Sequence, residues 1–216
     1  RCARIATLWQ APAALNTGSL VGFHSMVKSD GFVMGRRGAL REGRVLILRG
    51  DGDPMTGGSP CAILRSALRR FLSLGRQLME SPQALRQRIT ATLTEYLGES
   101  VQRSSIAFLA ELCGVPFPDD DLPVLRAARN DPKIMSDQIA ESVVALFTAM
   151  TARSPMILVL EDLHWADALT VKLLGAVLRE LAEQPLMILV LARPEVHERF
   201  PRLWAGLRLR EITLSG

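Results

Sequence analysis

Long apolar segments and paired cysteines are both missing from this sequence of 216 residues. The longest unbroken apolar run covers residues 186–192, whereas a membrane-spanning helix needs about 20 residues. No charged start followed by an apolar stretch marks a signal peptide. The three cysteines, Cys2, Cys61 and Cys113, form no CxxC pair, so the sequence predicts neither a disulfide framework nor a zinc site. We expect reduced thiols in a cytoplasmic protein.

Aromatic side chains are also scarce, with one tyrosine, three tryptophans and seven phenylalanines. The formal net charge is +4, and the arginines are scattered among acids rather than interleaved with aromatic residues. Because such a surface stacks bases poorly, nucleic-acid binding is not expected. The hydrophobic fraction of 48% instead indicates a folded domain with a sizeable apolar interior.

Apolar runs alternate with helical patterns over residues 45–216, which predicts an α/β fold. Residues 1–44 show no sustained period and are expected to form an irregular or degenerate N-terminal segment. Strands are predicted over residues 44–50, 156–160, 186–192 and 207–214. Helices are predicted from Ser59-Pro60, from Ser81-Pro82, and over residues 99–114, 132–152 and 168–183, with an irregular segment at 115–123. Both ends look cut, so we expect a fragment of a longer polypeptide.

The stretch MILVLEDLHWAD, residues 156–167, runs a buried strand into two adjacent acids, Glu161 and Asp162. A helix and the apolar run 186–192 follow, which predicts a βαβ unit with two parallel, neighbouring strands. Ligands of open α/β sheets bind beyond the carboxyl ends of the strands. Because Mg²⁺ favours one or two carboxylates with water and phosphate oxygens, the acids are candidates for a Mg²⁺–phosphate site. The alternative is a pair of solvated acids at a strand end.

Other polar residues fall near the same strand ends. Asp167 is expected to be the N-cap of the helix that follows the acids. His164 and Trp165 are expected to pack within the loop rather than to bind a ligand. Arg193 ends the second strand, where it is placed to contact a γ-phosphate. A salt bridge from Arg193 to one of the strand-end acids is the equal alternative.

The segment LVLEDLHWADALTVKLLGAVLRELAEQPLMILVLARPEVHERFPRLW resembles the AAA-like, STAND-related ATPase module of large bacterial signalling proteins. In those proteins the module follows a serine/threonine kinase domain or stands beside cyclase or transcription-regulator domains. RGDGDPMTGGSPCAILRSALR and ELCGVPFPDDDLPVLRAARNDPKIMSDQ resemble further parts of the kinase-linked version. The resemblance covers residues 45–216. It implies a P-loop NTPase-like three-layer fold with a parallel central sheet and an inserted helical region, incomplete at both ends.

The resemblance also implies ATP and Mg²⁺ as ligands. It makes Glu161 the Mg²⁺-side acid, Asp162 the water-activating acid and Arg193 a sensor of the bound nucleotide. The family more often has aspartate at the first of the two acidic positions. Glu161 departs from that pattern, which leaves open which acid has which role.

A phosphate-binding P-loop requires the pattern G-x-x-x-x-G-K-[ST], which this sequence does not contain. None of its lysines follows a glycine. The nearest candidate is GSLVGFHS, residues 18–25, in which Gly18 and Ser25 fit the pattern. Phe23 and His24 stand where the second glycine and the lysine belong. The loop is therefore degenerate, which argues against binding and hydrolysis of ATP by the chain as it stands.

Two functions follow from these observations. The first is an ATP-binding regulatory module, with ATPase activity implied by resemblance, in a kinase-linked signalling protein. The second is a non-hydrolysing interaction or scaffold domain derived from such an ATPase. The expected partners are ATP, other domains of the parent polypeptide and further copies of the chain, but not a membrane or a nucleic acid.

Overall fold

The computed structural model describes residues 4–10, 45–56, 60–74, 81–98, 103–120, 122–207 and 209–214. The strands are β1 (Arg4–Gln10), β2 (Leu46–Asp51), β3 (Met156–Glu161), β4 (Leu186–Ala192) and β5 (Leu209–Leu214). The α-helices are α2 (Ala62–Phe71), α3 (Pro82–Leu97), α4 (Arg103–Leu112), α5 (Pro123–Asn130), α6 (Pro132–Thr151), α7 (Ala168–Glu180) and α8 (Glu195–Arg199). Two short 3₁₀ turns are η2 (Pro54–Thr56) and η3 (Leu163–Trp165).

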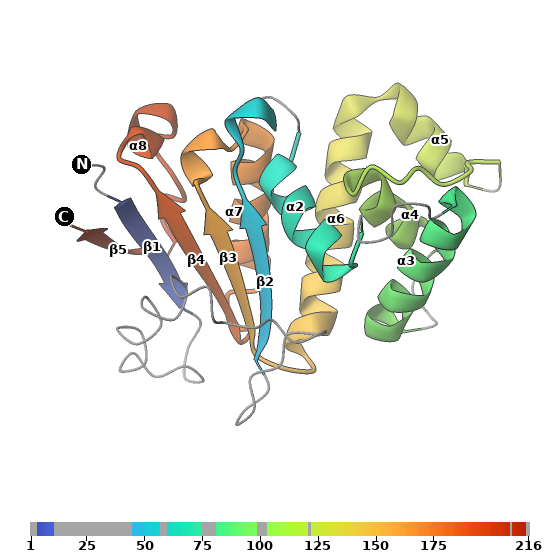
Figure 1. Cartoon of the computed structure of the whole chain (residues 1–216), viewed down its shortest axis with the longest axis horizontal. Coiled ribbons are helices and arrows are strands. Elements are labelled where there is room, and N and C mark those ends of the chain that lie inside the picture. The colour runs from blue at the N-terminus through green and yellow to red at the C-terminus, as the bar shows by residue number, and fades with distance from the viewer. Residues whose placement is uncertain are drawn as a thin grey trace.

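The strands form one sheet in the order β2-β3-β4-β1-β5 (Figure 1). β2, β3 and β4 are parallel, and the crossover from β3 to β4 runs through α7. This arrangement confirms the predicted βαβ unit and the α/β class with a parallel centre, consistent with a P-loop NTPase-like fold. The helices α3, α4, α5 and α6 lie between α2 and β3 in the chain, where a helical insertion was expected.

Strand β1 lies within residues 1–44, which the sequence predicts to be an irregular or degenerate segment and of which residues 11–44 lie outside the described part. It pairs antiparallel with both β4 and β5, so that Ile5 lies opposite Ala192 and Gln10 opposite Met187. Its partner strands are far away in the sequence, and no local sequence pattern predicts such pairings. Because β1 is antiparallel, its carboxyl end lies at the edge of the sheet where β4 begins.

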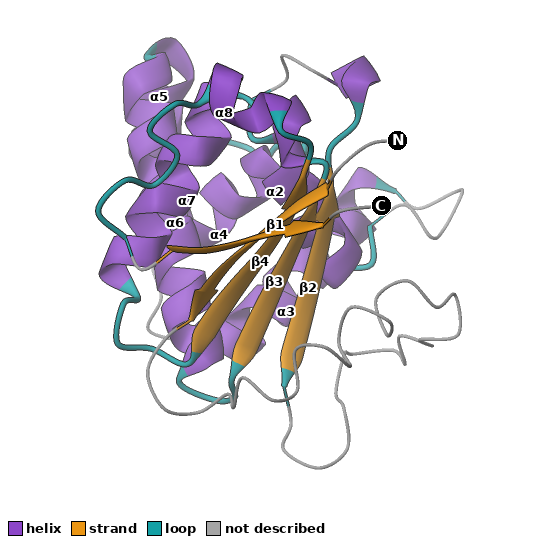
Figure 2. Cartoon of the chain, turned by 90° about the vertical axis from the view of Figure 1, so that its left-hand side faces the viewer, coloured by secondary structure: helices purple, strands orange, loops and turns teal. Residues whose placement is uncertain are grey.

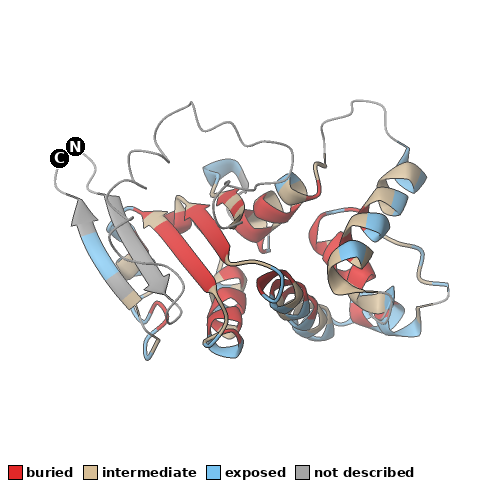
Figure 3. Cartoon of the chain, turned by 90° about the horizontal axis from the view of Figure 1, so that it is seen from below, coloured by how far each residue is buried: buried red, intermediate tan, exposed pale blue. Residues whose placement is uncertain are grey.

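The two faces of the sheet are packed differently. On one face, alternate residues of β2, β3 and β4 join a large core with α2, α6 and α7, which lie on that side (Figure 2). On the other face a smaller cluster consists of Ile157, Val159, Met187 and Leu189, with Val45 and Ile47 against it. Buried residues therefore dominate the central strands (Figure 3). Among the described residues, no helix is long and apolar enough to cross a membrane.

Capping residues set the starts of α3, α6 and α7 where the sequence predicts them. Ser81 accepts a hydrogen bond from the amide of Ala84 at the start of α3, and Gly98 ends that helix with a positive φ of 81°. The start predicted from Ser59-Pro60 is wrong by two residues, since α2 begins at Ala62 after a left-handed Cys61.

Two of the described helices were not predicted from the sequence. α5 begins at Pro123, which was interpreted as a helix breaker, and α8 follows β4. Ile134 of α6 is 39% exposed. It lies in the first turn of α6, before the part of the helix that packs against the core.

Candidate functional site

The acids and the arginine lie at the same edge of the sheet. β3 ends at Glu161 with Asp162 next, and β4 ends at Ala192 with Arg193 next. The two strands are hydrogen-bonded in parallel, with Leu160 opposite Val190. Their carboxyl ends therefore meet at one edge, as the βαβ prediction requires.

Glu161 is held by an arginine from the neighbouring strand. Nη2 of Arg49 on β2 lies 2.6 Å from Oε1 of Glu161, whose side chain is 22% exposed. Asp51, opposite Glu161 in the register, contacts Arg49 at 3.7 Å and also pairs with Arg70 of α2. Two acids and two arginines thus form a neutral cluster, in which the carboxylate of Glu161 already has a cationic partner.

Asp162 has a different environment. Its backbone is in the left-handed region, with φ 54° and ψ 43°, and its side chain is 50% exposed. Its carbonyl accepts the amide of Trp165 and lies where a Cβ on Gly52 would come within 2.4 Å. Because of this close approach, the position after β2 requires glycine. The contact also fixes the peptide of Asp162 and leaves its carboxylate facing solvent.

His164 lies between Asp162 and Arg193. Its Nδ1 accepts a hydrogen bond from the backbone amide of Arg193 at 3.4 Å and lies 4.0 Å from Oδ1 of Asp162. Burial lowers the pKa of His164, the charge of Asp162 opposes that shift, and Arg193 reinforces it. The ring is therefore neutral at neutral pH, and the side chain packs as the sequence predicts.

Among the described residues, no salt bridge joins Arg193 to Glu161 or Asp162: Glu161 pairs with Arg49, and Asp162 lies 4.0 Å from the neutral ring of His164. The side chain of Arg193 instead lines a pocket of about 450 Å³ between η3 and α8. The pocket is lined by His164, Trp165, Arg193, Glu195, Glu198 and Arg199. The role of Arg193 as a nucleotide sensor stays a prediction.

Sequence reasoning missed most of this pocket. Trp165 was expected to pack in the loop, but it is 37% exposed. Arg199 donates from Nη1 to the carbonyl of His164 at 3.1 Å and so ties α8 to the turn after β3. The only signal in the sequence was the charged stretch that directly follows the second apolar strand.

Asp167 is the N-cap of α7, as predicted. Its Oδ1 accepts the amide of Thr170 at 2.9 Å, and its Oδ2 accepts the amide of Cys61 at 2.9 Å. Because Cys61 is held in this way in a left-handed conformation, α2 starts only at Ala62. One carboxylate thus joins the starts of two helices.

The described residues fit Mg²⁺ only in part. They include no group of three or more His, Cys, Asp or Glu side chains able to hold a metal ion. Mg²⁺ bound with a nucleotide needs one or two carboxylates, because phosphate oxygens and water complete its shell. Asp162 fits that requirement, whereas Glu161 is occupied by Arg49. Gly18 and Ser25 lie outside the described residues.

Comparisons with known proteins identify the family. An uncharacterized protein of Rhizobium meliloti (strain 1021) is 28% identical over 67 residues, which are 31% of this chain and 6% of that protein. The chain therefore spans only a small part of that relative. No solved structure matches significantly. The AAA ATPase domain family matches residues 35–190, more than half of the sequence. The chain belongs to the AAA ATPase domain family.

Proposed function

We propose that the chain is an ATP-binding regulatory module of a larger, kinase-linked bacterial signalling protein. Membership of the AAA ATPase domain family suggests a nucleotide-binding regulatory module. The match to a small part of a much longer relative supports the multidomain context. The observation that carries the proposal is the parallel pairing of β3 and β4, which brings Asp162 and Arg193 to one edge.

The two residues have complementary roles at this edge. Asp162 supplies a carboxylate that is half exposed and rigidly attached to the end of β3. Arg193 supplies a guanidinium. Among the described residues, it forms no ion pair with Glu161 or Asp162. When bound, Mg²⁺ would screen the charge of the nucleotide phosphates and link them to a carboxylate. Asp162 would then face the metal and Arg193 the outermost phosphate.

A titration of the full chain with a fluorescent ATP analogue, with and without Mg²⁺, tests this function. Saturable binding that strengthens with Mg²⁺ supports the proposal. Circular dichroism on the same sample establishes that the protein is folded, so that a lack of binding has a clear meaning. No binding by a folded sample contradicts the proposal.

A second candidate is a non-hydrolysing interaction domain, and two specific observations favour it. Arg49 forms an ion pair with Glu161, the acid that would otherwise approach the metal. In addition, β1 is antiparallel to β4, so its carboxyl end lies at the edge of the sheet opposite Glu161 and Asp162. This candidate predicts no nucleotide binding, together with binding to another domain of the parent protein or self-association detectable by sedimentation.

A further inference from the structure

The start of α2 contains a backbone strain that the local sequence does not require. Cys61, directly before the helix, has φ 55° and ψ 31°, in the left-handed region that residues with a Cβ rarely adopt. Ser59-Pro60 is the pattern of a helix that begins at Pro60, with serine as the N-cap and proline in the first turn. The observed start at Ala62 conflicts with that pattern. Such a conflict between local sequence and structure is expected at functional or strained sites.

One carboxylate keeps Cys61 in this conformation. Oδ2 of Asp167 accepts the Cys61 amide at 2.9 Å, while Oδ1 accepts the amide of Thr170 as the cap of α7. A strained backbone persists only where its surroundings hold it. Without the contact to Oδ2, the strain favours a right-handed Cys61, and α2 then starts at Pro60. Because Asp167 directly follows the η3 turn, which begins after Asp162, the contact links α2 to the acid edge.

The first turn of α2 is also connected to the end of α4. Arg65 donates from Nη2 to the carbonyl of Pro60 at 3.2 Å and from Nε to the carbonyl of Leu112 at 3.0 Å. Arg69, one turn further along α2, donates from Nη1 to the carbonyl of Cys113 at 2.6 Å. The terminal carbonyls of a helix have no partner within it, so these arginines fix the end of α4. In this way α2 joins the sheet to the helical insertion beside it (Figure 1).

A single peptide unit joins the two sets of contacts. Its carbonyl belongs to Pro60 and accepts from Arg65, whereas its N–H belongs to Cys61 and donates to Asp167. The unit is planar, so it turns as a whole. In a helix that starts at Pro60, its carbonyl points along the helix axis toward the amide of Leu64. The turn therefore breaks both contacts together and removes one of the bonds that position Arg65 at α4.

We propose that the peptide unit between Pro60 and Cys61 is a two-position switch that connects the acid edge with the end of α4. In the position described above, Asp167 holds the peptide unit and Arg65 is anchored on its carbonyl. In the other position, α2 begins at Pro60 and Arg65 is released from that carbonyl. The inference goes beyond the proposed function, because it does not depend on which ligand the acid edge binds.

Asp167→Asn should release the switch while it keeps the cap of α7. Asparagine is as good an N-cap as aspartate, and its NH₂ group, placed where Oδ2 lies, donates to the hydroxyl of Thr170 but cannot accept the N–H of Cys61. We expect the NMR chemical shifts of Cys61 to move toward right-handed helical values. The amides of Gly114 and Val115, which close the end of α4, should exchange with solvent about fivefold faster, the effect of one ordinary hydrogen bond.

Two substitutions of Cys61 test the strain directly. Cys61→Gly and Cys61→Ala remove the same thiol, but only glycine adopts a positive φ without strain. Glycine should therefore favour the described position at least about fivefold over alanine. The end of α4 should then exchange more slowly in Cys61→Gly than in Cys61→Ala. If Cys61 only packs against the core, the order is reversed, because glycine makes the backbone more flexible.

Arg65→Gln tests the connection to α4. The end of α4 is already released in that variant, so adding Asp167→Asn should not accelerate the exchange of Gly114 and Val115 further. Arg69→Gln is the matched control. It removes the other bond from α2 to the end of α4 but does not involve Pro60. Asp167→Asn should therefore still accelerate exchange in Arg69→Gln.

Hydrogen exchange of the full, folded chain, followed by NMR without nucleotide, measures all of these variants. The expected result is a joint change at the start of α2 and at the end of α4, which disappears in Arg65→Gln. A change confined to the start of α2, with Gly114 and Val115 exchanging as in wild type, overturns the inference. The same holds if Cys61→Ala exchanges more slowly than Cys61→Gly, a comparison that stays informative if Asp167→Asn folds poorly.

Discussion

The guanidinium of Arg49 lies 2.6 Å from the carboxylate of Glu161, across the neighbouring strands β2 and β3. The pair stands at the edge of the sheet where the sequence predicts a metal site. The guanidinium of Arg49 therefore takes the position that a metal ion would have beside Glu161. Asp162, the other acid, pairs with no arginine or lysine among the described residues and remains half exposed.

Replacing Arg49 by glutamine should free Glu161 for the metal. The side chains are partly exposed, so the loss of the ion pair should change the free energy of unfolding by less than about 1 kcal/mol. We expect the Mg²⁺ dependence of ATP-analogue binding to become stronger, as measured by titration at several Mg²⁺ concentrations. Arg70→Gln, which affects Asp51 instead, is the matched control. Equal responses of the two variants would contradict this role of Arg49.

Replacing Asp167 by alanine should be more destabilising than the loss of an ordinary helix cap. Removing a cap costs about 1 kcal/mol, and the buried amide of Cys61 loses its acceptor as well, so we expect about 2 kcal/mol or more. Urea denaturation measures this change. The control is Asp131→Ala, which removes an exposed cap of α6 and should cost about 1 kcal/mol. Equal costs would show that the link to Cys61 contributes nothing.

Stability should fall in mildly acidic solution because His164 is buried in its neutral form. Burial lowers its pKa below the value of 6.5 that it has in the unfolded chain. The unfolded state then binds more protons, so the contribution of His164 is complete above about pH 6.5 and is lost as the pH falls through the folded pKa. Unfolding free energies measured between pH 7.5 and pH 5 should decline less steeply in His164→Gln. Parallel curves for both proteins would contradict this interpretation.

The thiols of Cys61 and Cys113 should be unreactive while the chain is folded. Burial is the main cause that raises the pKa of each thiol to about 12, with Asp167 adding to the shift at Cys61. Since only the thiolate reacts, a disulfide reagent at pH 8 should modify them at the rate of unfolding. The measurement is best made in Cys2→Ser, where only these two thiols remain. Rapid reaction in the absence of denaturant would be inconsistent with their burial.

The sequence predicted the centre of the fold because local patterns determine it. The apolar runs of β3 and β4, the helix between them and the caps Ser81 and Asp167 are all visible in short windows. Strand β1 was not predictable, because its stability depends on partners near residues 190 and 210. Arg49 and Arg199 were missed for the same reason, since each reaches a residue far away in the sequence.

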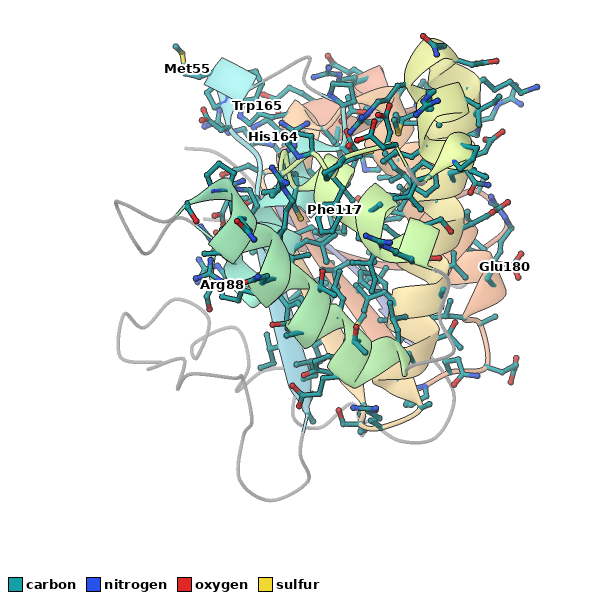
Figure 4. All side chains as sticks on the ribbon, turned by 90° about the vertical axis from the view of Figure 1, so that its right-hand side faces the viewer. Met55, Arg88, Phe117, His164, Trp165 and Glu180 are labelled. Atoms are coloured by element: carbon teal, nitrogen blue, oxygen red, sulfur yellow. The ribbon has the colours of Figure 1, made fainter. Side chains whose placement is uncertain are left out.

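Binding of a Mg²⁺–ATP analogue to Asp162→Asn and Arg193→Ala tests the central claim most directly. Asparagine tolerates the left-handed backbone of Asp162, and Arg193 is exposed, so both variants should fold normally. Glu180→Gln, an exposed acid at the end of α7 and away from His164 (Figure 4), is the control. We predict that both edge variants weaken binding at least about tenfold, the loss of one charged contact, while the control binds as wild type. Wild-type affinity in both edge variants would contradict a nucleotide site at this edge.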